Sequence, residues 1–285
     1  MSRISTGYGP FGPKAWQQTS WDARAAGNFI GGGMGGGLIV FTAWSGASGV
    51  ALSWLVVCAL GFVAAGLLCV ASELGRPLRA IRVLRNPRTS WMARESWTAL
   101  LLFPAGLLAA AGVSGWAWIA GVLAVLFVYC QARMLQAAKG IPAWREPLLR
   151  PLVLSSGLVE GGGVFLLTAP LHGAASAATL LLFASLVLVR GIIWVAYRRR
   201  LASGAAAGAL RALDQAGRVL LVAGTLLPLL LLAAAIAGVF APPLVALGGL
   251  LAALCGAWLK LVIVTRAGFN QGFALAHMPV RGTRA

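Results

Sequence analysis

Residues 72–97, SELGRPLRAIRVLRNPRTSWMARESW, place six arginines and two glutamates between two strongly apolar stretches of the chain. The stretches on either side, 48–71 and 95–114, each suffice to cross a bilayer, which takes about 20 mostly apolar residues. We therefore expect the charged stretch to be a loop at a membrane surface. Its two carboxylates, Glu73 and Glu95, would then lie near the depth of the lipid head groups.

The composition extends this interpretation to the whole chain. Of its 285 residues, 60% are hydrophobic and only 10% are charged, whereas soluble domains carry about 25% charged residues. We expect an all-α membrane protein, with a segment 1–26, a membrane domain 27–264 and a tail 265–285. Its eight transmembrane helices, in one bundle, are expected at 27–45, 48–71, 95–114, 116–137, 151–171, 174–197, 217–240 and 243–264. The start of the chain lacks the pattern of a cleavable signal peptide, so the first span is expected to remain.

The 23 lysines and arginines predict the orientation of the bundle. They gather in the two end segments and in alternate connections, while the connections near 45–48, 114–115, 171–174 and 241–243 contain none. Basic residues mark the cytoplasmic side of membrane proteins. We therefore expect both termini and the long loops to be cytoplasmic. The net charge of +17 then reflects membrane orientation, and we expect no nucleic-acid partner.

The loop itself has internal order. From Pro77 onward, apolar residues alternate with arginines in a way that predicts a short helix lying on the membrane surface, where its basic residues would meet anionic head groups. Asn86–Pro87 should end this helix. Thr89 or Ser90 can then cap the start of the following span.

The carboxylates of this loop are candidates for redox-linked proton exchange. Ionisable groups at membrane depth cost about 2.5–3.5 kcal/mol and often mark a functional site. A quinone takes up two electrons and two protons, so its oxygens need groups that exchange protons. Glu95 is the first candidate and Glu73 the second. Trp91 lies one helical turn before Glu95, and we expect these three residues to form one quinone site together with Asn28, Arg76, Arg88 and Arg94. The alternative for Glu95 is a structural ion pair with Arg94 or a loop arginine.

Three residues in the first span have two interpretations each. Asn28 can hydrogen-bond a quinone oxygen, or cap a helix or bond to a neighbouring one. Gly33 and Gly37, in GNFIGGGMGGG, allow close helix packing or form a slot for a flat ligand.

Ionisable residues also fall deep within the predicted spans. Glu160 and Lys260 are candidates for a proton relay, or Glu160 is a buried acid bonded across helices. Arg190 and Lys260 are expected to extend along their helices to the basic side, as long cationic side chains do.

The chain offers few ligands for a redox metal. Its two histidines, His172 and His277, lie outside the predicted spans, so a bis-histidine haem within the bundle is not expected. We also predict no metal site or iron–sulfur cluster, because no CxxC pair occurs among the four cysteines, Cys58, Cys69, Cys130 and Cys255. Electrons would therefore pass to or from a subunit docked on the cytoplasmic side.

Two stretches, ELGRPLRAIRVLRNPRTSWMARE and RAGFNQGFALAHMPVRG, resemble the membrane-anchor subunits of dimethyl sulfoxide reductase and polysulfide reductase type molybdoenzymes. The resemblance implies a haem-free anchor that binds menaquinone or ubiquinone and has no catalytic centre of its own. It also implies two partners, a four-cluster ferredoxin-like [4Fe-4S] subunit and a molybdopterin catalytic subunit. The complex would lie in the cytoplasmic membrane of a bacterium and take part in anaerobic respiration.

Several positions match that family's signature. Glu95 falls where the family has a glutamate associated with quinol binding, and Glu73 where some members have a histidine. The matching residues of the loop are expected to orient it beneath the iron–sulfur subunit; they are Arg76, Arg88, Ser90 and Arg94. The signature is expected on the cytoplasmic side, so the partner subunits should be cytoplasmic too. This arrangement resembles that of the sulfite-oxidising and phenylacetyl-CoA-oxidising complexes.

Two other classes of function remain open. An ion-coupled secondary transporter would use Glu160 and Lys260 as its coupling site, and broken helices in symmetric halves would favour it; the sequence gives no sign of either. A purely structural scaffold would leave the glutamates dispensable.

Overall fold

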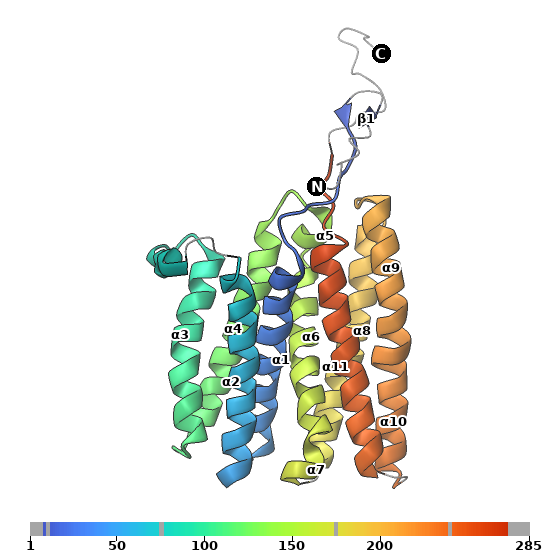
Figure 1. The fold of residues 1–285 in the computed structure, drawn as a ribbon. Helices are drawn as coiled ribbons and strands as arrows, with labels where there is room; N and C mark the ends of the chain where they lie inside the picture. Colours follow the sequence, from blue (N-terminus) through green and yellow to red (C-terminus); the bar gives the residue numbers. More distant parts are fainter. Residues whose placement is uncertain (1–7, 10–11, 74–76, 174–175, 239–240, 273–285) are drawn as a thin grey trace.

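The computed structural model describes residues 8–9, 12–73, 77–173, 176–238 and 241–272, and this part of the chain is a bundle of long helices (Figure 1). Two short antiparallel strands precede the bundle, β1 (Tyr8–Gly9) and β2 (Gly12–Pro13). The helices are α1 (Ala23–Ser45), α2 (Gly49–Ala71), the 3₁₀ helix η1 (Pro77–Arg85), α3 (Trp91–Ala110), α4 (Trp116–Ala137), α5 (Pro142–Arg145), α6 (Leu149–Leu167), α7 (Ala169–His172), α8 (Ala177–Leu201), α9 (Ala207–Leu221), the π-helix η2 (Val222–Leu226), α10 (Leu227–Ile236) and α11 (Ala241–Thr265).

Six helical stretches of the described chain are long and apolar enough to cross a membrane: α2, α4, α6, α8, the continuous rod from α9 to α10, and α11. The protein is therefore a helical, multi-pass membrane protein. Each of the eight predicted ranges overlaps a long helix. The two long helices that fall short in apolarity are α1, which contains seven glycines, and α3, which begins with charged residues.

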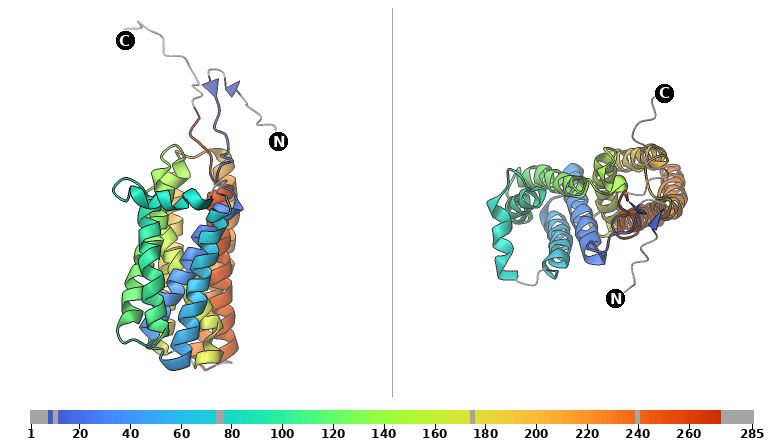
Figure 2. Two further views of the ribbon diagram at one scale, coloured as in Figure 1. Left: turned by 60° about the vertical axis from the view of Figure 1, so that its left-hand side comes forward. Right: turned by 90° about the horizontal axis from the view of Figure 1, so that it is seen from above.

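The two ends of the bundle differ in their connections. One end has tight turns, such as those at Gly46 and Gly115, whose positive φ angles of 67° and 81° suit glycine. The other end carries η1, α5 and the described segments 14–22 and 266–272 (Figure 1). We call it the basic end, because the described loop arginines lie in its connections. Seen along the axis, α1 and α6 lie in the middle, with α2–α4 on one side and α8–α11 on the other (Figure 2).

The predicted surface helix is present as η1, which lies across the bundle axis (Figure 2) and ends at Arg85, before Asn86–Pro87. Ser90 caps α3, since its hydroxyl accepts a hydrogen bond from the Ala93 amide at 3.3 Å. The Trp97 indole donates to the Leu84 carbonyl at 3.0 Å and ties η1 to α3. The predicted short helix, its end before Asn86–Pro87 and the cap at Ser90 are confirmed.

The glycines of α1 let four neighbouring helices approach its backbone: α2, α4, α6 and α11. A Cβ on Gly37 would overlap the Gly157 carbonyl of α6, and one on Gly35 would overlap the Ala59 carbonyl of α2. Close helix packing is thus the correct interpretation of Gly33 and Gly37. Neighbouring helices fill this space, so the predicted slot for a flat ligand is wrong.

Apolar side chains fill the interior in two layers along the axis. The layer nearer the basic end includes Trp144, whose indole donates to the Ile263 carbonyl at 2.9 Å. Tyr197 donates to the Ala143 carbonyl at 2.8 Å, so both bonds fasten α5 to the bundle. Large apolar residues such as Val122 and Leu181 remain exposed on the outer faces, as expected of helices that face lipid.

Replacing Gly37 by alanine should test the α1–α6 contact. The added methyl group has no room against the Gly157 backbone, so the variant should lose about 1–3 kcal/mol of stability. Thermal unfolding in detergent measures the loss. Gly61→Ala on α2 is the matched control, because a Cβ there meets nothing within 4 Å. Equal unfolding temperatures for the two variants would contradict the packing described here.

Candidate functional site

A cavity of about 570 Å³ opens between α1, α2, η1 and the start of α3, near the basic end. Most of its lining is apolar, and its polar lining is limited to a few groups. We call it the Glu95 cavity; it is lined by Ser20, Trp21, Ala25, Asn28, Phe29, Leu67, Val70, Ala71, Glu73, Arg82, Val83, Met92, Glu95, Ser96 and Met134. Cavities of this size, with few polar groups, are typical of small-molecule sites.

The carboxylate of Glu95 is held by neutral amides. It lies in the second turn of α3, buried at 3% exposure, and accepts hydrogen bonds from Asn28 Nδ2 at 3.0 Å and Gln131 Nε2 at 3.1 Å. Both bonds end on Oε1, and no described residue donates to Oε2. Arg94 instead donates to the carbonyls of Pro87 and Arg88, both at 2.7 Å. The alternative of an ion pair between Glu95 and Arg94 is therefore wrong.

Asn28 and Gln131 complete a network across three helices. Gln131 Nε2 also donates to the Asn28 carbonyl at 2.9 Å. The side-chain oxygens of both amides are buried without a hydrogen-bond partner among the described residues. Since buried polar atoms normally have partners and Asn28 lines the cavity, its Oδ1 can accept a hydrogen bond from a hydroxyl group of a ligand.

Sequence reasoning missed Gln131. Its signal was an amide within an apolar span, where such groups usually bond across helices. Its place depends on Gly32, because a Cβ there would overlap the Gln131 amide.

Charged groups surround the mouth of the cavity. Arg24 pairs with Asp22 at 2.8 Å and with Glu73 at 3.7 Å. Hydrogen bonds from Arg24 lower the pKa of Asp22 to about 2. Partial burial, and then the charge of Asp22, raise the pKa of Glu73 above its ordinary value. The structure thus places Glu73, Asn28 and Glu95, all predicted from the sequence, around one cavity.

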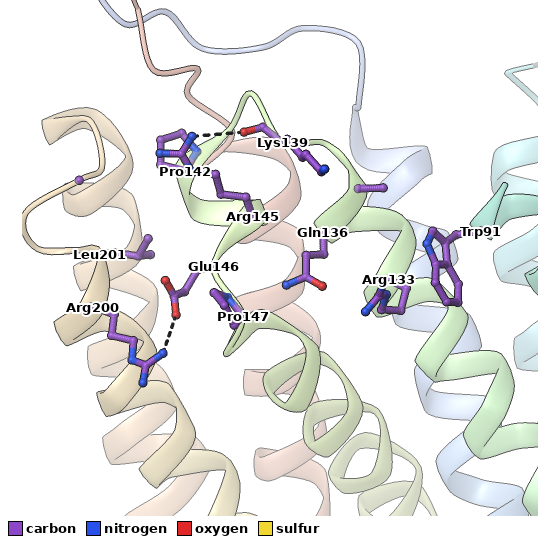
Figure 3. A pocket seen from close by; sticks show the side chains of 12 residues that line it. Trp91, Arg133, Gln136, Lys139, Pro142, Arg145, Glu146, Pro147, Arg200 and Leu201 are labelled. Atoms are coloured by element: carbon purple, nitrogen blue, oxygen red, sulfur yellow. Dashed lines mark hydrogen bonds and ion pairs between the residues drawn. The ribbon is translucent and has the colours of Figure 1, made fainter. Parts of the chain in front are cut away.

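Trp91 lies in a different cavity, of about 660 Å³, which Figure 3 shows. Its ring is stacked with two guanidinium groups, Arg94 at 4.1 Å and Arg133 at 4.5 Å from the ring centre. Neither Arg88 nor Arg94 lines the Glu95 cavity, and Arg76 lies outside the described residues. The grouping of Trp91, Arg88 and Arg94 with Glu95 therefore does not hold for direct contact with a ligand there.

We call this second space the basic cavity; it is lined by Trp91, Arg133, Gln136, Ala137, Lys139, Pro142, Arg145, Glu146, Pro147, Arg200, Leu201 and Gly204. Four of these side chains are cationic and one is acidic. Glu146 pairs with Arg200 at 3.5 Å (Figure 3). The excess of positive charge makes this part of the basic end suited to an acidic partner surface.

A third group of polar residues lies deeper in the bundle, and we call it the buried charge cluster: Glu160, Arg190 and Lys260. Lys260 donates to Glu160 Oε2 at 2.9 Å, so the two predicted relay residues are in contact. Arg190 donates to the carbonyls of Ala252 at 2.9 Å and Gly224 at 2.6 Å. Arg190 and Lys260 are 0% and 2% exposed. The expectation that they extend to the basic side is wrong, because carbonyls inside the bundle accept their hydrogen bonds.

Within the described residues, no three or more His, Cys, Asp or Glu side chains lie close enough together to hold a metal ion.

Comparison with known proteins adds no relative to these observations: no protein-family model matches the chain, and no curated protein matches it.

Replacing Gln131 by leucine should test the amide network. The variant leaves Glu95 with one donor and an underbonded buried carboxylate, so it should lose about 1–3 kcal/mol of stability. Gln136→Leu on the same helix is the control, since the Gln136 side chain makes no hydrogen bond with the described residues. Thermal unfolding of both variants in detergent measures the difference, and a Gln131→Leu protein as stable as the control would contradict the network.

Proposed function

We propose that this chain is the haem-free membrane-anchor subunit of a molybdenum and iron–sulfur oxidoreductase, and that its Glu95 cavity binds quinone or quinol. The observation that carries the proposal is the Glu95 carboxylate, buried in an apolar cavity with one oxygen unbonded within the described structure. The resemblance of residues 73–95 and 266–282 to anchor subunits supports the same conclusion.

The lining of the cavity suits an aromatic ring that carries two oxygens. Bound there, a quinone exchanges two electrons and two protons with its surroundings. Glu95 holds or releases a proton at Oε2, and Asn28 accepts a hydrogen bond at Oδ1. Phe29 and Met92 supply apolar contact and keep water from the carboxylate.

Glu73 connects this chemistry to solvent. Its side chain is 27% exposed beside Arg24, so it can exchange protons with water at the cavity mouth. The pKa of Glu73 is raised toward neutral pH. A group exchanges protons most readily when its pKa lies near the pH of its surroundings.

The membrane topology follows from the same proposal. We infer eight crossings, with α1 and α3 among them; the glycines of α1 and the charged residues near the start of α3 account for their lower apolarity. By the positive-inside rule the basic end faces the cytoplasm of a bacterium. An iron–sulfur subunit with [4Fe-4S] clusters docks on this end, which is the end nearer the Glu95 cavity, and a molybdopterin subunit docks on it in turn.

Two observations favour the alternative, an ion-coupled transporter. Glu160 and Lys260 form a buried ion pair, and the rod from α9 to α10 is interrupted by the π-helix η2. Such a transporter would use the buried charge cluster for coupling and would not need Glu95. The role of Glu95 therefore distinguishes the two functions.

Replacing Glu95 by glutamine should lower quinone-linked turnover of the purified complex about 100-fold or more, because the variant cannot exchange a proton at this position. Turnover with a soluble redox dye, which bypasses the membrane subunit, should stay within twofold of the wild type. Parallel assays with quinone and with the dye measure the two activities.

Glu146→Gln is the matched control, because it removes a carboxylate from the basic cavity and leaves the Glu95 cavity intact. Wild-type quinone turnover in the Glu95→Gln complex would exclude the proposed site. Membrane vesicles that show ion-driven uptake of a solute, unaffected by Glu95→Gln, would support the transporter.

A further inference from the structure

The buried charge cluster has an excess positive charge. With ordinary protonation, Glu160 contributes −1, while Lys260 and Arg190 contribute +1 each, so the cluster carries a net +1. The other carboxylate buried among the described helices, Glu95, bonds to Asn28 and Gln131 instead. An unbalanced charge in an apolar interior is unfavourable, and ionisable residues at this depth usually have a function.

Loss of one proton would make the cluster neutral, and Lys260 is the group placed to lose it. Arginine side chains remain charged in proteins. The guanidinium group of Arg190 is also held by hydrogen bonds to two carbonyls, those of Ala252 and Gly224. The other titratable group near Arg190 is the thiol of Cys255. The Cys255 sulfur and Arg190 Nη2 both border Gly224, because a Cβ placed on that glycine would lie 3.4 Å from each of them. Lys260 has the acceptor Glu160 directly opposite, at 2.9 Å.

After Lys260 loses a proton, the negative charge of Glu160 still has a cationic neighbour, Arg190. A Cβ on Gly256 would lie 2.8 Å from Arg190 Nη1 and 2.9 Å from Glu160 Oε1, so both groups border the space that this glycine leaves. Glu160 Oε1, Arg190 Nε and Ser156 Oγ have no hydrogen-bond partner among the described residues. Buried polar atoms of this kind commonly bind water, which carries protons between ionisable groups.

The cluster is connected to the Glu95 cavity through α1. Lys260 donates its second hydrogen bond to the Phe29 carbonyl at 2.9 Å, and the Phe29 side chain lines the cavity. The preceding residue, Asn28, binds Glu95 on the other side of α1. Removing the Lys260 proton weakens the hold on a segment of α1 that forms the cavity wall.

We propose that Glu160 and Lys260 form a second proton-exchange site, which binds and releases one proton and responds through α1 to the charge in the Glu95 cavity. On release, an N–H bond of the Lys260 ammonium group breaks and the proton forms an O–H bond on Glu160 Oε2. The carboxyl group then gives this proton to water. Lys260 is left as a neutral amine, and the Glu160 carboxylate is left facing Arg190. The coupling rests on the proposed quinone site, whereas the proton exchange does not.

Infrared spectroscopy of the full chain in lipid nanodiscs tests both parts. Without quinone, a carboxylate band that Glu160→Gln removes should shift as the pH is varied, and Lys260→Met should abolish the shift. Glu146→Gln is the control and should keep it.

A second pair of variants leaves every charge in place. Gly256→Ala should move the midpoint of the Glu160 band, because the methyl group displaces Arg190 or Glu160. Gly248→Ala on the same helix should behave as the wild type, since its Cβ would make only ordinary contacts of 3.5 Å or more. A Glu160 band that does not change with pH in the folded wild type, or that shifts unchanged in Lys260→Met, overturns the proton-exchange site.

The coupling is tested by adding a menaquinone or ubiquinone analogue and reducing it in the same sample. The Glu160 band should respond in the wild type and stay constant in Glu95→Gln. A quinone-dependent Glu95 band without a Glu160 response overturns the coupling alone. Absence of any quinone-dependent band, that of Glu95 included, overturns the proposed function and with it the coupling, while the pH series still decides the proton exchange.

Discussion

Two side chains, one from α4 and one from α11, donate hydrogen bonds to consecutive carbonyls of α1, and both polar sites include these bonds. Gln131 reaches the Asn28 carbonyl at 2.9 Å, and Lys260 reaches the Phe29 carbonyl at 2.9 Å. A carbonyl within a helix is normally screened by the side chain four residues later. Here those positions are Gly32 and Gly33, where a Cβ would overlap Gln131 and Lys260. The glycines thus give two polar side chains access to the backbone.

This arrangement also explains how a glycine-rich helix is held in the bundle. Lipid offers no hydrophobic drive for helices to associate, so close backbone packing and hydrogen bonds between helices must supply it. The packing comes from α2 and α6, and the hydrogen bonds come from α4 and α11. The same contacts that fix α1 therefore place the Glu95 cavity and the buried charge cluster on two sides of one helix.

The sequence predicted features that follow from local pattern. Apolar stretches located the long helices, and Ser90 and Asn86–Pro87 bounded the surface loop. Glu73, Asn28 and Glu95 were predicted to act together, and they line one cavity. The prediction that Trp91 lies in the same site as Glu95 was wrong. A spacing of four residues puts two side chains on roughly the same face of a helix, but the Trp91 ring stacks with Arg94 and Arg133 and lines the basic cavity. The burial of Arg190 had no local signal, since one of its acceptors, the Gly224 carbonyl, belongs to a π-helix that no sequence pattern indicated.

The partners of three carboxylates separate their chemical roles. Glu73 faces the guanidinium group of Arg24 at the surface, and Glu160 faces the ammonium group of Lys260 in the interior. Protonating Glu73 or Glu160 would remove the negative charge that faces Arg24 or Lys260, respectively. Glu95 is held by the neutral amides of Asn28 and Gln131, so a proton can arrive on its second oxygen without leaving a neighbouring charge uncompensated. A buried carboxylate of this kind can change protonation with little rearrangement around it, which is the property that proton-coupled electron transfer to a membrane carrier requires.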